Sequence, residues 1–584
     1  MNLFLKRNKK KQRFTGVTLP LLSTSPQRLR TFTYHPCKQF NPKKNINAYR
    51  LHKMLYTQEK HEQVLQSLKD LKEKKFEQAM LKQELREVCS QRKRKEAVFK
   101  RQAITERLEW HFGEKRKILS EIKILIIGGG MAGLSAANRL LALGYRNVKI
   151  LEASNRLGGR IKRFDFGKNS HDFVELGVET FLAGSSSSSI DSLALQNNVV
   201  LKPVDEARIV SILNSKGDEI STRSIHRGMR IFNQMETQGE LIYTHIADSS
   251  DTVNLSYANF FREKLRRLHG GNHKQAIAVR DAFTCLYDES RRALGDSAGN
   301  SAVQWFSHNN SRLPRGANRV KIPDSMSSLV HCLTKQFKPD AVCFKAKVVR
   351  VDWSMKMKES TVQVECAHGQ TFTANHVIVA VPLGVLKKHH ASIFSPELPK
   401  EKVKVIENVG FGSVSKLFVF FHKSNVFSPF SLLWRKAAPT SPEGSVTLNI
   451  RTLKRCIVEV SSLGSYLEDV SETEIVEELV QVLSVFLQKP LPYPERFIRS
   501  NWHRDSLFYG THPYLTTSCT LADFQLLAKP LVTHRNLPAV LFAGDYTYDN
   551  YSNLLDAARR SGLREAERIN QLYNKYFGYE NTNP

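Results

Sequence analysis

A β-strand, a helix and a second β-strand are predicted in close succession after residue 123, where the hydrophobic pattern of the chain changes. Residues 124–127 are four consecutive apolar residues bounded by glycine, which is typical of a parallel strand buried on both faces. Residues 134–143 have helical composition, and residues 148–151 form a second, mainly apolar run. This order predicts a β-α-β unit, the repeating element of an α/β fold.

A second pattern, over residues 55–120, is that of one long amphipathic helix or two. Glu, Lys, Gln and Leu dominate there, and apolar residues recur every three or four positions at Leu65, Leu68, Phe76, Met80 and Leu85. The heptad pattern is too irregular for a coiled coil. We expect this segment either to pack along the body of the protein or to bind a protein partner. Its basic run at residues 92–95 keeps nucleic acid as a third alternative.

Charge is distributed unevenly along the 584 residues and sets the N-terminal region apart. Residues 1–120 hold 30 Lys and Arg against 11 Asp and Glu, which is +19 of the formal net charge of +31. Residues 1–54 contain no acidic residue. They are expected to form a basic tail, with three alternatives: a solvated disordered segment, a mitochondrial targeting segment, or a patch for nuclear import or nucleic-acid binding.

Other features of the sequence exclude several classes of protein. No run of about 18 apolar residues occurs, so no ordinary transmembrane helix is expected. The N-terminus lacks the apolar core of a secretory signal, and the chain ends in Asn-Thr-Asn-Pro and not in a peroxisomal tripeptide. We therefore expect an intracellular protein, cytoplasmic or nuclear, with a mitochondrial location as the alternative. The eight cysteines include no C-x-x-C pair, which disfavours a zinc ribbon or a dense disulfide framework, and no metal site is predicted.

The loop between the first strand and the helix carries the glycines of a dinucleotide-binding site. Gly128, Gly130 and Gly133 form the pattern G-x-G-x-x-G, with Met131 and Ala132 between the last two glycines. Such glycines allow a tight turn, close approach of the backbone to a pyrophosphate, and close packing of helix against strand. The helix N-terminus adds unpaired N–H groups that favour phosphate. Glu152 ends the second strand 19 residues after Gly133, where an acid binds the ribose diol.

A second glycine pair follows the acid. Gly158 and Gly159 lie between Arg156 and Arg160. Because a guanidinium forms bidentate, charge-assisted hydrogen bonds with phosphate, this stretch suits further contacts to a pyrophosphate.

From here the sequence resembles the flavin-dependent amine oxidase family, which binds FAD. The resemblance spans roughly residues 121–578 and rests on separated stretches in the family's order. These are LEASNRLGGRI at 151–161 with VELG at 174–177, RVKIPDSMSSLVHCLTKQF at 319–337 with AKVVRVDW at 346–353, HVIVAVPLGVLKK at 376–388 with NVGFGSVSKLFVFF at 408–421, and LFAGDYTYDNYSNLLDAARRSGLREAERI at 541–569.

The resemblance implies a large two-lobed α/β protein. A doubly wound, Rossmann-like and discontinuous FAD-binding domain is expected from residues 121–205, 315–390 and 498–578. An inserted α+β substrate domain is expected from residues 206–314 and 391–497, with helices in residues 255–307. Residues 1–54 and 55–120 would form the basic, helical N-terminal extension.

The resemblance also implies roles for single residues in the cofactor site. Glu152 corresponds to the acid on the ribose, Arg156 to an adenosine-side contact, and Asp545 to the acid on the ribityl or phosphate side. Leu554 and Leu555 begin a helix that faces the flavin pyrimidine carbonyl, where its dipole stabilises negative charge. The remaining cofactor-binding positions that the resemblance implies are Gly158, Gly159 and Arg160 at the flavin and pyrophosphate, Gly177 of the VELG stretch, and Val348, whose backbone meets the adenine.

Three residues are candidates for catalysis. Lys416 is a cation in an apolar, strand-like run, and the matching lysine of the family holds a water near flavin N5. Trp502 matches a tryptophan beside the flavin. Two aromatic rings usually flank the flavin in this family, and His512 and Leu554 stand at the corresponding positions here. Thr511 replaces the cysteine through which monoamine oxidases attach FAD, so the cofactor is expected to be non-covalent.

The activity implied is oxidation of an amine, of polyamine type, with oxygen reduced to hydrogen peroxide. Glu179 is the one acid after the VELG stretch, near where polyamine oxidases carry a carboxylate or histidine. Two alternatives stay open: a relative of lysine-specific histone demethylases that acts on a protein tail, and a non-catalytic scaffold stabilised by FAD. The small-molecule partners expected are the amine and oxygen.

Overall fold

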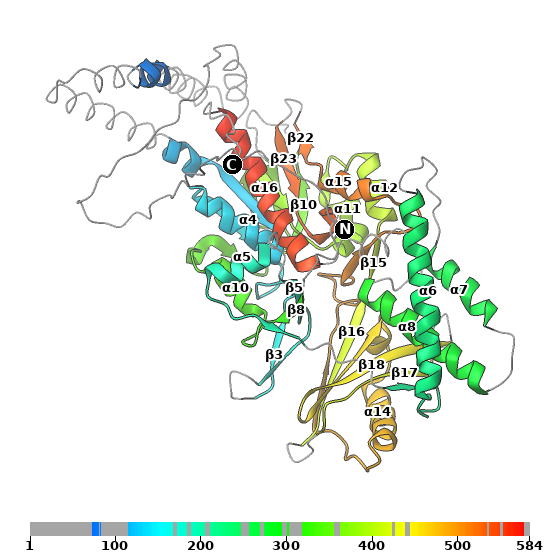
Figure 1. The fold of residues 1–584 in the computed structure, drawn as a ribbon. Helices are drawn as coiled ribbons and strands as arrows, with labels where there is room; N and C mark the ends of the chain where they lie inside the picture. The colour runs from blue at the N-terminus through cyan, green and yellow to red at the C-terminus, as the bar shows by residue number, and fades with distance from the viewer. Residues whose placement is uncertain are drawn as a thin grey trace, which may run out of the picture. The chain divides into compact units, whose positions relative to one another are not determined.

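The computed structural model describes a chain of mixed α and β structure with several sheets (Figure 1). The described residues are 73–80, 82, 115–167, 172–183, 189–204, 211–246, 256–268, 274–294, 301–302, 318–354, 362–422, 427–438, 444–533, 537–548 and 553–576. The expected basic tail of residues 1–54 lies outside them. Of the expected amphipathic segment, residues 73–80 and 115–120 are helical, and most of the remainder also lies outside the described residues.

The first sheet has six strands from distant parts of the sequence. In spatial order they are β22 (Leu531–Val532), β23 (Pro538–Phe542), β13 (His376–Val379), β1 (Lys123–Ile127), β2 (Asn147–Leu151) and β9 (Val342–Cys343). All neighbouring pairs are parallel except the edge pair of β22 and β23. The apolar run of β1 is buried on both faces because Ile124 and Ile126 pack into one core and Leu125 and Ile127 into another, while β13 and β2 pair with its two edges. The strand, helix and strand expected after residue 123 are confirmed as β1, α4 (Met131–Ala142) and β2.

Helix α4 packs against α16 (Leu554–Tyr576), and the two lie side by side near the first sheet (Figure 1). Close contact is possible because Gly562 of α16 has no side chain: a Cβ there would lie 2.1 Å from the carbonyl oxygen of Ala132. Helices α5 (Ser189–Gln196) and α10 (Ser327–Thr334) pack against α16 and α4 respectively. The C-terminal helix thereby adjoins the first helix of the β-α-β unit.

A second sheet has four strands, all from residues 348–395. Its order is β12 (Thr371–Ala374), β11 (Val362–Cys366), β10 (Val348–Asp352) and β14 (Phe394–Ser395). The two sheets share an apolar core with α11 (Leu383–Ile393), α12 (Lys400–Asn408) and α15 (Leu521–Ala528). In this core the inward-facing Val351 and Val364 are fully buried.

The third sheet has six strands, which come from residues 211–213 and 414–499. Its order is β20 (Arg496–Arg499), β16 (Val414–Phe420), β19 (Ile457–Leu463), β18 (Ser445–Lys454), β17 (Ser431–Ala437) and β7 (Ser211–Leu213). Successive side chains of each strand point to opposite faces of the sheet, so apolar residues are present on both faces. Helices cover both of them. Leu432 and Trp434 pack with α14 (Glu472–Phe486), whereas Leu433 packs with α8 (Lys274–Leu294).

Helix α8 lies beside α6 (Thr222–Ile246) and forms an aromatic cluster with it and α7 (Tyr257–Arg267). The helices expected in residues 255–307 are therefore present as α7 and α8. Short pairs complete the fold: β3 (Arg163–Asp165) with β4 (Phe173–Glu175), β15 (Gly410–Gly412) with β21 (His512–Tyr514), and β8 (Asn318–Lys321) between β5 (Phe181–Ala183) and β6 (Lys202–Pro203). Short helices are found at α13 (Tyr466–Asp469), η2 (Pro339–Ala341) and η3 (Asp545–Thr547). Within the described part of the chain, no helix combines the length and apolar composition that crossing a membrane requires.

Candidate active site

A cavity of about 1170 Å³ is bordered by the first sheet, the third sheet and the start of α16. Small-molecule sites commonly have volumes of ~300–1,000 Å³, so there is room for a large ligand and a second, smaller one. The carboxyl ends of β1, β2 and β13 open into it, which is where open α/β sheets bind ligands. Of the site residues predicted from the sequence, all except Gly133 and Arg156 line this cavity.

Two of the motif glycines serve the packing of the chain. Gly128 has a φ of +106°, and a Cβ on it would lie 2.8 Å from the carbonyl oxygen of Ala380. A Cβ on Gly133 would lie 2.0 Å from the carbonyl oxygen of Gly128, so Gly133 lets α4 approach the loop closely. Neither position tolerates a side chain, whatever the cavity holds.

Gly130 differs, because the space beside it is open to the cavity. A Cβ there would meet no atom of the described chain closer than the Cα of Gly159, at 4.0 Å. Gly159 itself has a φ of +56°, a conformation that glycine adopts readily. We call Gly130 and Gly159 the glycine cradle. Gly130 also caps α4, whose first turn holds no acid and whose first residues, Met131 and Ala132, line the cavity. This is the geometry of an anion-binding helix N-terminus.

Glu152 directly follows β2 and points its carboxylate at the glycine loop. One carboxylate oxygen accepts a hydrogen bond from the N–H of Gly129 at 2.7 Å, and the other accepts one from the N–H of Ser154 at 2.8 Å. A carboxylate has about four acceptor sites, so each oxygen can also accept from a hydroxyl. The side chain is fixed at the cavity edge in a position that suits a ribose diol.

Arg156 has a different environment from the one expected for a ligand contact. Its guanidinium donates to the carbonyl oxygens of Gly159 at 2.6 Å and Ile161 at 2.9 Å. It therefore braces the loop that contains Gly158 and Gly159. Its contact with the adenosine side of a cofactor stays a prediction.

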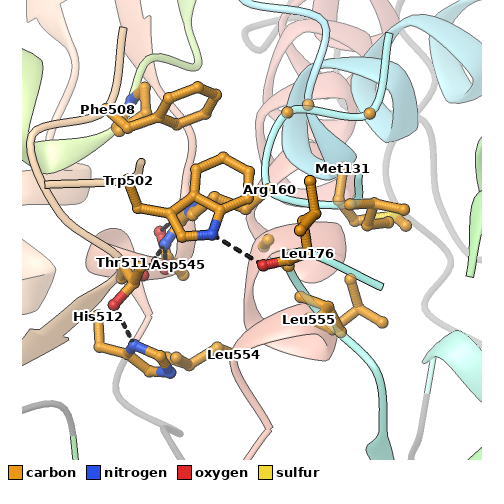
Figure 2. Close-up of a pocket in the computed structure, with 18 of the residues that line it drawn as sticks. Met131, Arg160, Leu176, Trp502, Phe508, Thr511, His512, Asp545, Leu554 and Leu555 are labelled. Carbon is orange, nitrogen blue, oxygen red and sulfur yellow. Dashed lines mark hydrogen bonds and ion pairs between the residues drawn. The ribbon is translucent and has the colours of Figure 1, made fainter. Parts of the chain in front are cut away.

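Arg160 is paired with Asp545 across the cavity wall (Figure 2). The same guanidinium donates to the carbonyl oxygen of Thr511. Burial alone lowers the pKa of Arg160, but Asp545 more than compensates and the pKa is raised. The sequence predicts a cofactor contact for each of the two residues, and the structure adds that they contact each other.

Leu554 and Leu555, the first residues of α16, line the cavity as the helix begins there. Asp556, in the same first turn, is directed away and accepts from the N–H groups of Ser189 and Ile190 at 2.7 and 3.1 Å. Val348 borders the cavity from the start of β10. The predicted helix start at Leu554 is confirmed.

Lys416 enters the cavity from β16, and its ammonium is not a lone charge. Its Nζ lies 3.3 Å from the carbonyl oxygen of Gly177 and 3.4 Å from that of Glu175. It also lies 3.5 Å from a carboxylate oxygen of Glu179 and 3.5 Å from one of Glu459. The apolar sequence around Lys416 predicts a buried cation but gives no sign of these partners.

Glu459 and Arg451 are functional candidates that the sequence analysis missed. Arg451 lies 2.6 Å from Glu459 and also contacts Glu179. Burial on its own raises the pKa of Glu459, but Lys416 and Arg451 hold it well below its usual range. A charged residue within the apolar run IVEVSSL was the available signal, because such a residue is buried only with a partner.

A second ion pair lies on the same side of the cavity. Arg292 of α8 pairs with Glu289, which also accepts from the amide of Asn449 at 3.1 Å. Burial opposes ionisation of Glu289, yet Arg292 and the hydrogen bonds lower its pKa. All three side chains line the cavity.

Trp502 and His512 are held at the cavity by hydrogen bonds to the chain (Figure 2). The indole N–H of Trp502 donates to the carbonyl oxygen of Leu176 at 3.0 Å, and its ring meets Phe508 edge-on with centroids 4.8 Å apart. His512 Nδ1 lies 2.6 Å from the hydroxyl oxygen of Thr511. Burial, together with the charge of Arg160, lowers the pKa of His512 to about 4, so the imidazole is neutral at pH 7.

Comparison with known proteins identifies the family. A family model described as flavin containing amine oxidoreductase matches residues 131–570. The chain belongs to the flavin-containing amine oxidoreductase family. The resemblance found in the sequence is thereby confirmed, and it places the protein among the oxidoreductases that act on amines.

Individual relatives of this amine oxidoreductase align over most of the chain. Protein anon-37Cs of Drosophila simulans is 29% identical over 486 residues, which cover 78% of this chain and 93% of that protein. The peroxisomal N(1)-acetyl-spermine/spermidine oxidase of Homo sapiens is 26% identical over 508 residues, with 77% and 95% covered. Lysine-specific histone demethylase 1 homolog 1 of Arabidopsis thaliana is 24% identical over 459 residues, with 76% and 52% covered.

Membership of the amine oxidoreductases implies a flavin cofactor, and the cavity fits one. The glycine cradle leaves open the space that a pyrophosphate needs, beside the N-terminus of α4. Glu152 supplies a fixed carboxylate at the end of β2. Among the described residues that line the cavity there is no cysteine, and Cys519 is a buried free thiol elsewhere.

Proposed function

We propose that the protein oxidises an amine of polyamine type, with FAD as a non-covalently bound cofactor and oxygen as the electron acceptor. One observation carries the proposal: a single cavity joins a dinucleotide site, formed by the glycine cradle and Glu152, to a charged region that contains Lys416. The relative named N(1)-acetyl-spermine/spermidine oxidase supplies the substrate class. Non-covalent binding is supported by Thr511, which stands where a covalent attachment would need cysteine.

The reaction balances as a two-electron oxidation. FAD, when bound, accepts a hydride from the carbon beside the amine nitrogen and passes the electrons to oxygen. The C–N single bond becomes an imine, which water hydrolyses to an aldehyde and a smaller amine. Oxygen takes up two electrons and two protons and leaves as hydrogen peroxide.

The residues of the chain provide the positions and charges for this chemistry. His512 is neutral at pH 7, so it does not repel an incoming ammonium and has a ring nitrogen available as an acceptor. Lys416 lines the same cavity and would place a positive charge near the bound flavin, and we assign to it the water that would assist reaction with oxygen. The first turn of α16 brings the positive end of a helix dipole to the same cavity.

One feature favours a second candidate, a non-catalytic FAD scaffold. The positions of the two flanking aromatic rings hold His512 and Leu554. Of the tyrosines nearby in the sequence, Tyr514 and Tyr548 do not line the cavity, and Tyr551 lies outside the described residues. At the two positions themselves the chain thus has one ring, the imidazole of His512, and one aliphatic side chain.

Purified, flavin-loaded protein distinguishes the two candidates. Each member of a panel of mono-, di- and polyamines is mixed with the protein without oxygen, and loss of oxidised-flavin absorbance is followed. Reduction by an amine, with one hydrogen peroxide per turnover after oxygen is admitted, supports the oxidase. Absence of reduction by every amine, in protein whose flavin is reduced normally by dithionite, favours the scaffold.

A further inference from the structure

The charged part of the cavity is a compact set of three acids and three bases, which we call the charged chamber. Its residues come from α8, from β16, β18 and β19 of the third sheet, and from the segment after β4. The glycine cradle, in contrast, follows strands of the first sheet. The members of the charged chamber are Glu179, Glu289, Arg292, Lys416, Arg451 and Glu459, and all six line the cavity.

Each acid of the charged chamber already has a basic partner. Glu179 and Glu459 are both contacted by Lys416 and by Arg451. Glu289 is paired with Arg292. The six formal charges therefore cancel, and the neutral His512 adds none.

Among the described residues, the other two acids that line the cavity lie outside the charged chamber and have partners of their own. Glu152 accepts hydrogen bonds from backbone N–H groups beside the glycine loop, and Asp545 is paired with Arg160. The remaining charged residues that line the cavity, within the part of the chain that the structure describes, are basic: Arg319, Lys321 and Lys347. A chain of several ammonium groups that entered this chamber would lose water without gaining a carboxylate for each charge, which is costly.

We propose that Arg451 is a specificity-determining residue that restricts the charged chamber to a substrate segment with a single positive charge. This inference rests on the proposed amine oxidation and narrows its substrate. Further ammonium groups of a longer polyamine would have to lie outside the chamber. We assign this restriction to Arg451 because it bridges Glu179 and Glu459, and its charge, together with that of Lys416, neutralises these two acids.

Two short substrates test the proposal: butylamine, and its diamine analogue with an ammonium at each end. The measured quantity is the ratio of kcat/KM for the monoamine to that for the diamine, from flavin reduction without oxygen. The wild-type protein is expected to prefer the monoamine. Arg451→Met leaves the chamber with a net charge of −1, so the ratio should fall about tenfold, which corresponds to about 1.4 kcal/mol. Arg451→Lys retains the charge and should preserve most of the wild-type ratio.

Two further variants keep the test informative if Arg451→Met folds poorly. Glu179→Gln gives the chamber a net positive charge and should move the ratio in the opposite direction. Arg435→Met removes an arginine of β17 that is paired with Asp281 and does not line the cavity, so the ratio should stay at the wild-type value.

Three results would overturn the proposal. They are wild-type preference for the diamine, an unchanged ratio in folded, flavin-loaded Arg451→Met, or equal changes in Arg451→Met and Arg435→Met. If no amine of the full panel reduces the wild-type flavin, the proposed oxidation fails on its own account; if only these two short amines fail to reduce it, they serve as binding probes. In that case the affinities of the two amines are compared instead of their kcat/KM values. The dissociation constants are measured from amine-induced changes in the flavin absorbance spectrum, and each variant should shift the preference in the same direction as above.

Discussion

Arg160 and Asp545 are 385 residues apart in the chain and form a two-point ion pair, with nitrogen–oxygen distances of 2.7 and 2.8 Å. Asp545 is almost fully buried, whereas the Arg160 side chain is 23% exposed to the cavity. The pair joins the loop after β2 to the segment before α16. The two ends of the family's sequence pattern are thereby held together at the cofactor site.

Asp545→Asn should weaken this junction. The substitution leaves the Arg160 guanidinium without its charge partner, and loss of one member of a buried pair costs about 3–5 kcal/mol. Because Arg160 is partly exposed, we expect about 2 kcal/mol of lost stability and a lower flavin content. Urea unfolding of flavin-free protein measures the first effect. Asp165→Asn is the matched control, since its pair with Arg163 is at the surface and should contribute at most about 1 kcal/mol.

Gly130→Val should abolish flavin binding and leave the fold intact. The new side chain meets no neighbouring atom of the described chain within van der Waals distance at its Cβ, but it fills the glycine cradle. Flavin per protein is measured from absorbance, and folding from circular dichroism. Gly133→Val is the contrasting variant, because its Cβ would lie 2.0 Å from a backbone oxygen and folding itself should fail. Full flavin content in Gly130→Val would show that the motif is misinterpreted.

Lys416→Met should slow reoxidation of the flavin by oxygen by about a hundredfold, because removal of one preorganised charge at a reacting centre has effects of about that size. Stopped-flow mixing of reduced protein with oxygen isolates this step. Lys436→Met is the control: Lys436 also pairs with a glutamate, Glu478, but does not line the cavity. An unchanged rate in flavin-loaded Lys416→Met removes the residue from the oxygen step.

The flavin should be released when the protein is denatured by acid or heat. Thr511 cannot form the thioether that holds a covalent flavin, and the described residues that line the cavity include no cysteine. Filtration after denaturation should leave all yellow colour in the filtrate. Flavin retained on the precipitated chain contradicts this prediction.

Stability should fall below about pH 6.5 because of His376. Its Nδ1–H donates to the carbonyl oxygen of Pro538 at 2.6 Å, its Nε2 lies 2.8 Å from the hydroxyl oxygen of Tyr573, and burial lowers its pKa from 6.5 to about 4. The unfolded chain takes up a proton at His376 below pH 6.5, and the folded chain resists this until about pH 4. Stability present above pH 6.5 is therefore lost toward pH 4, by about 1.4 kcal/mol per pH unit for one proton.

Unfolding of the wild type and of His376→Gln at several pH values tests this linkage. The variant starts less stable but should show a shallower loss between pH 6.5 and 4. His422→Gln is the control, since His422 is mostly exposed and its removal should leave the slope unchanged. Equal slopes in all three proteins would show that His376 is already protonated, or not buried, in the folded state.

The sequence by itself determined the part of the site that is local in the chain. The strand, glycine loop and helix at 123–142, the acid at the end of β2 and the start of α16 were all predictable. The strand, loop, helix and acid depend on short runs of residues whose backbone preferences and spacing suffice, whereas the start of α16 was implied by the family resemblance. Gly130, Glu152 and Leu554 all line the cavity.

Only the tertiary structure decided the charge environment. Glu459 lies near Lys416 because β16 and β19 pair in the register that sets Lys416 opposite Ser461, and Arg451 approaches because β18 pairs with β19. A shift of one residue in either register would turn these side chains to the opposite face of the sheet. The direction of Arg156 toward its own loop and the pairing of Arg160 with Asp545 likewise depend on contacts between distant segments. Residue types and spacing predict which charges are present, whereas strand register and long-range packing determine which of them neutralise one another.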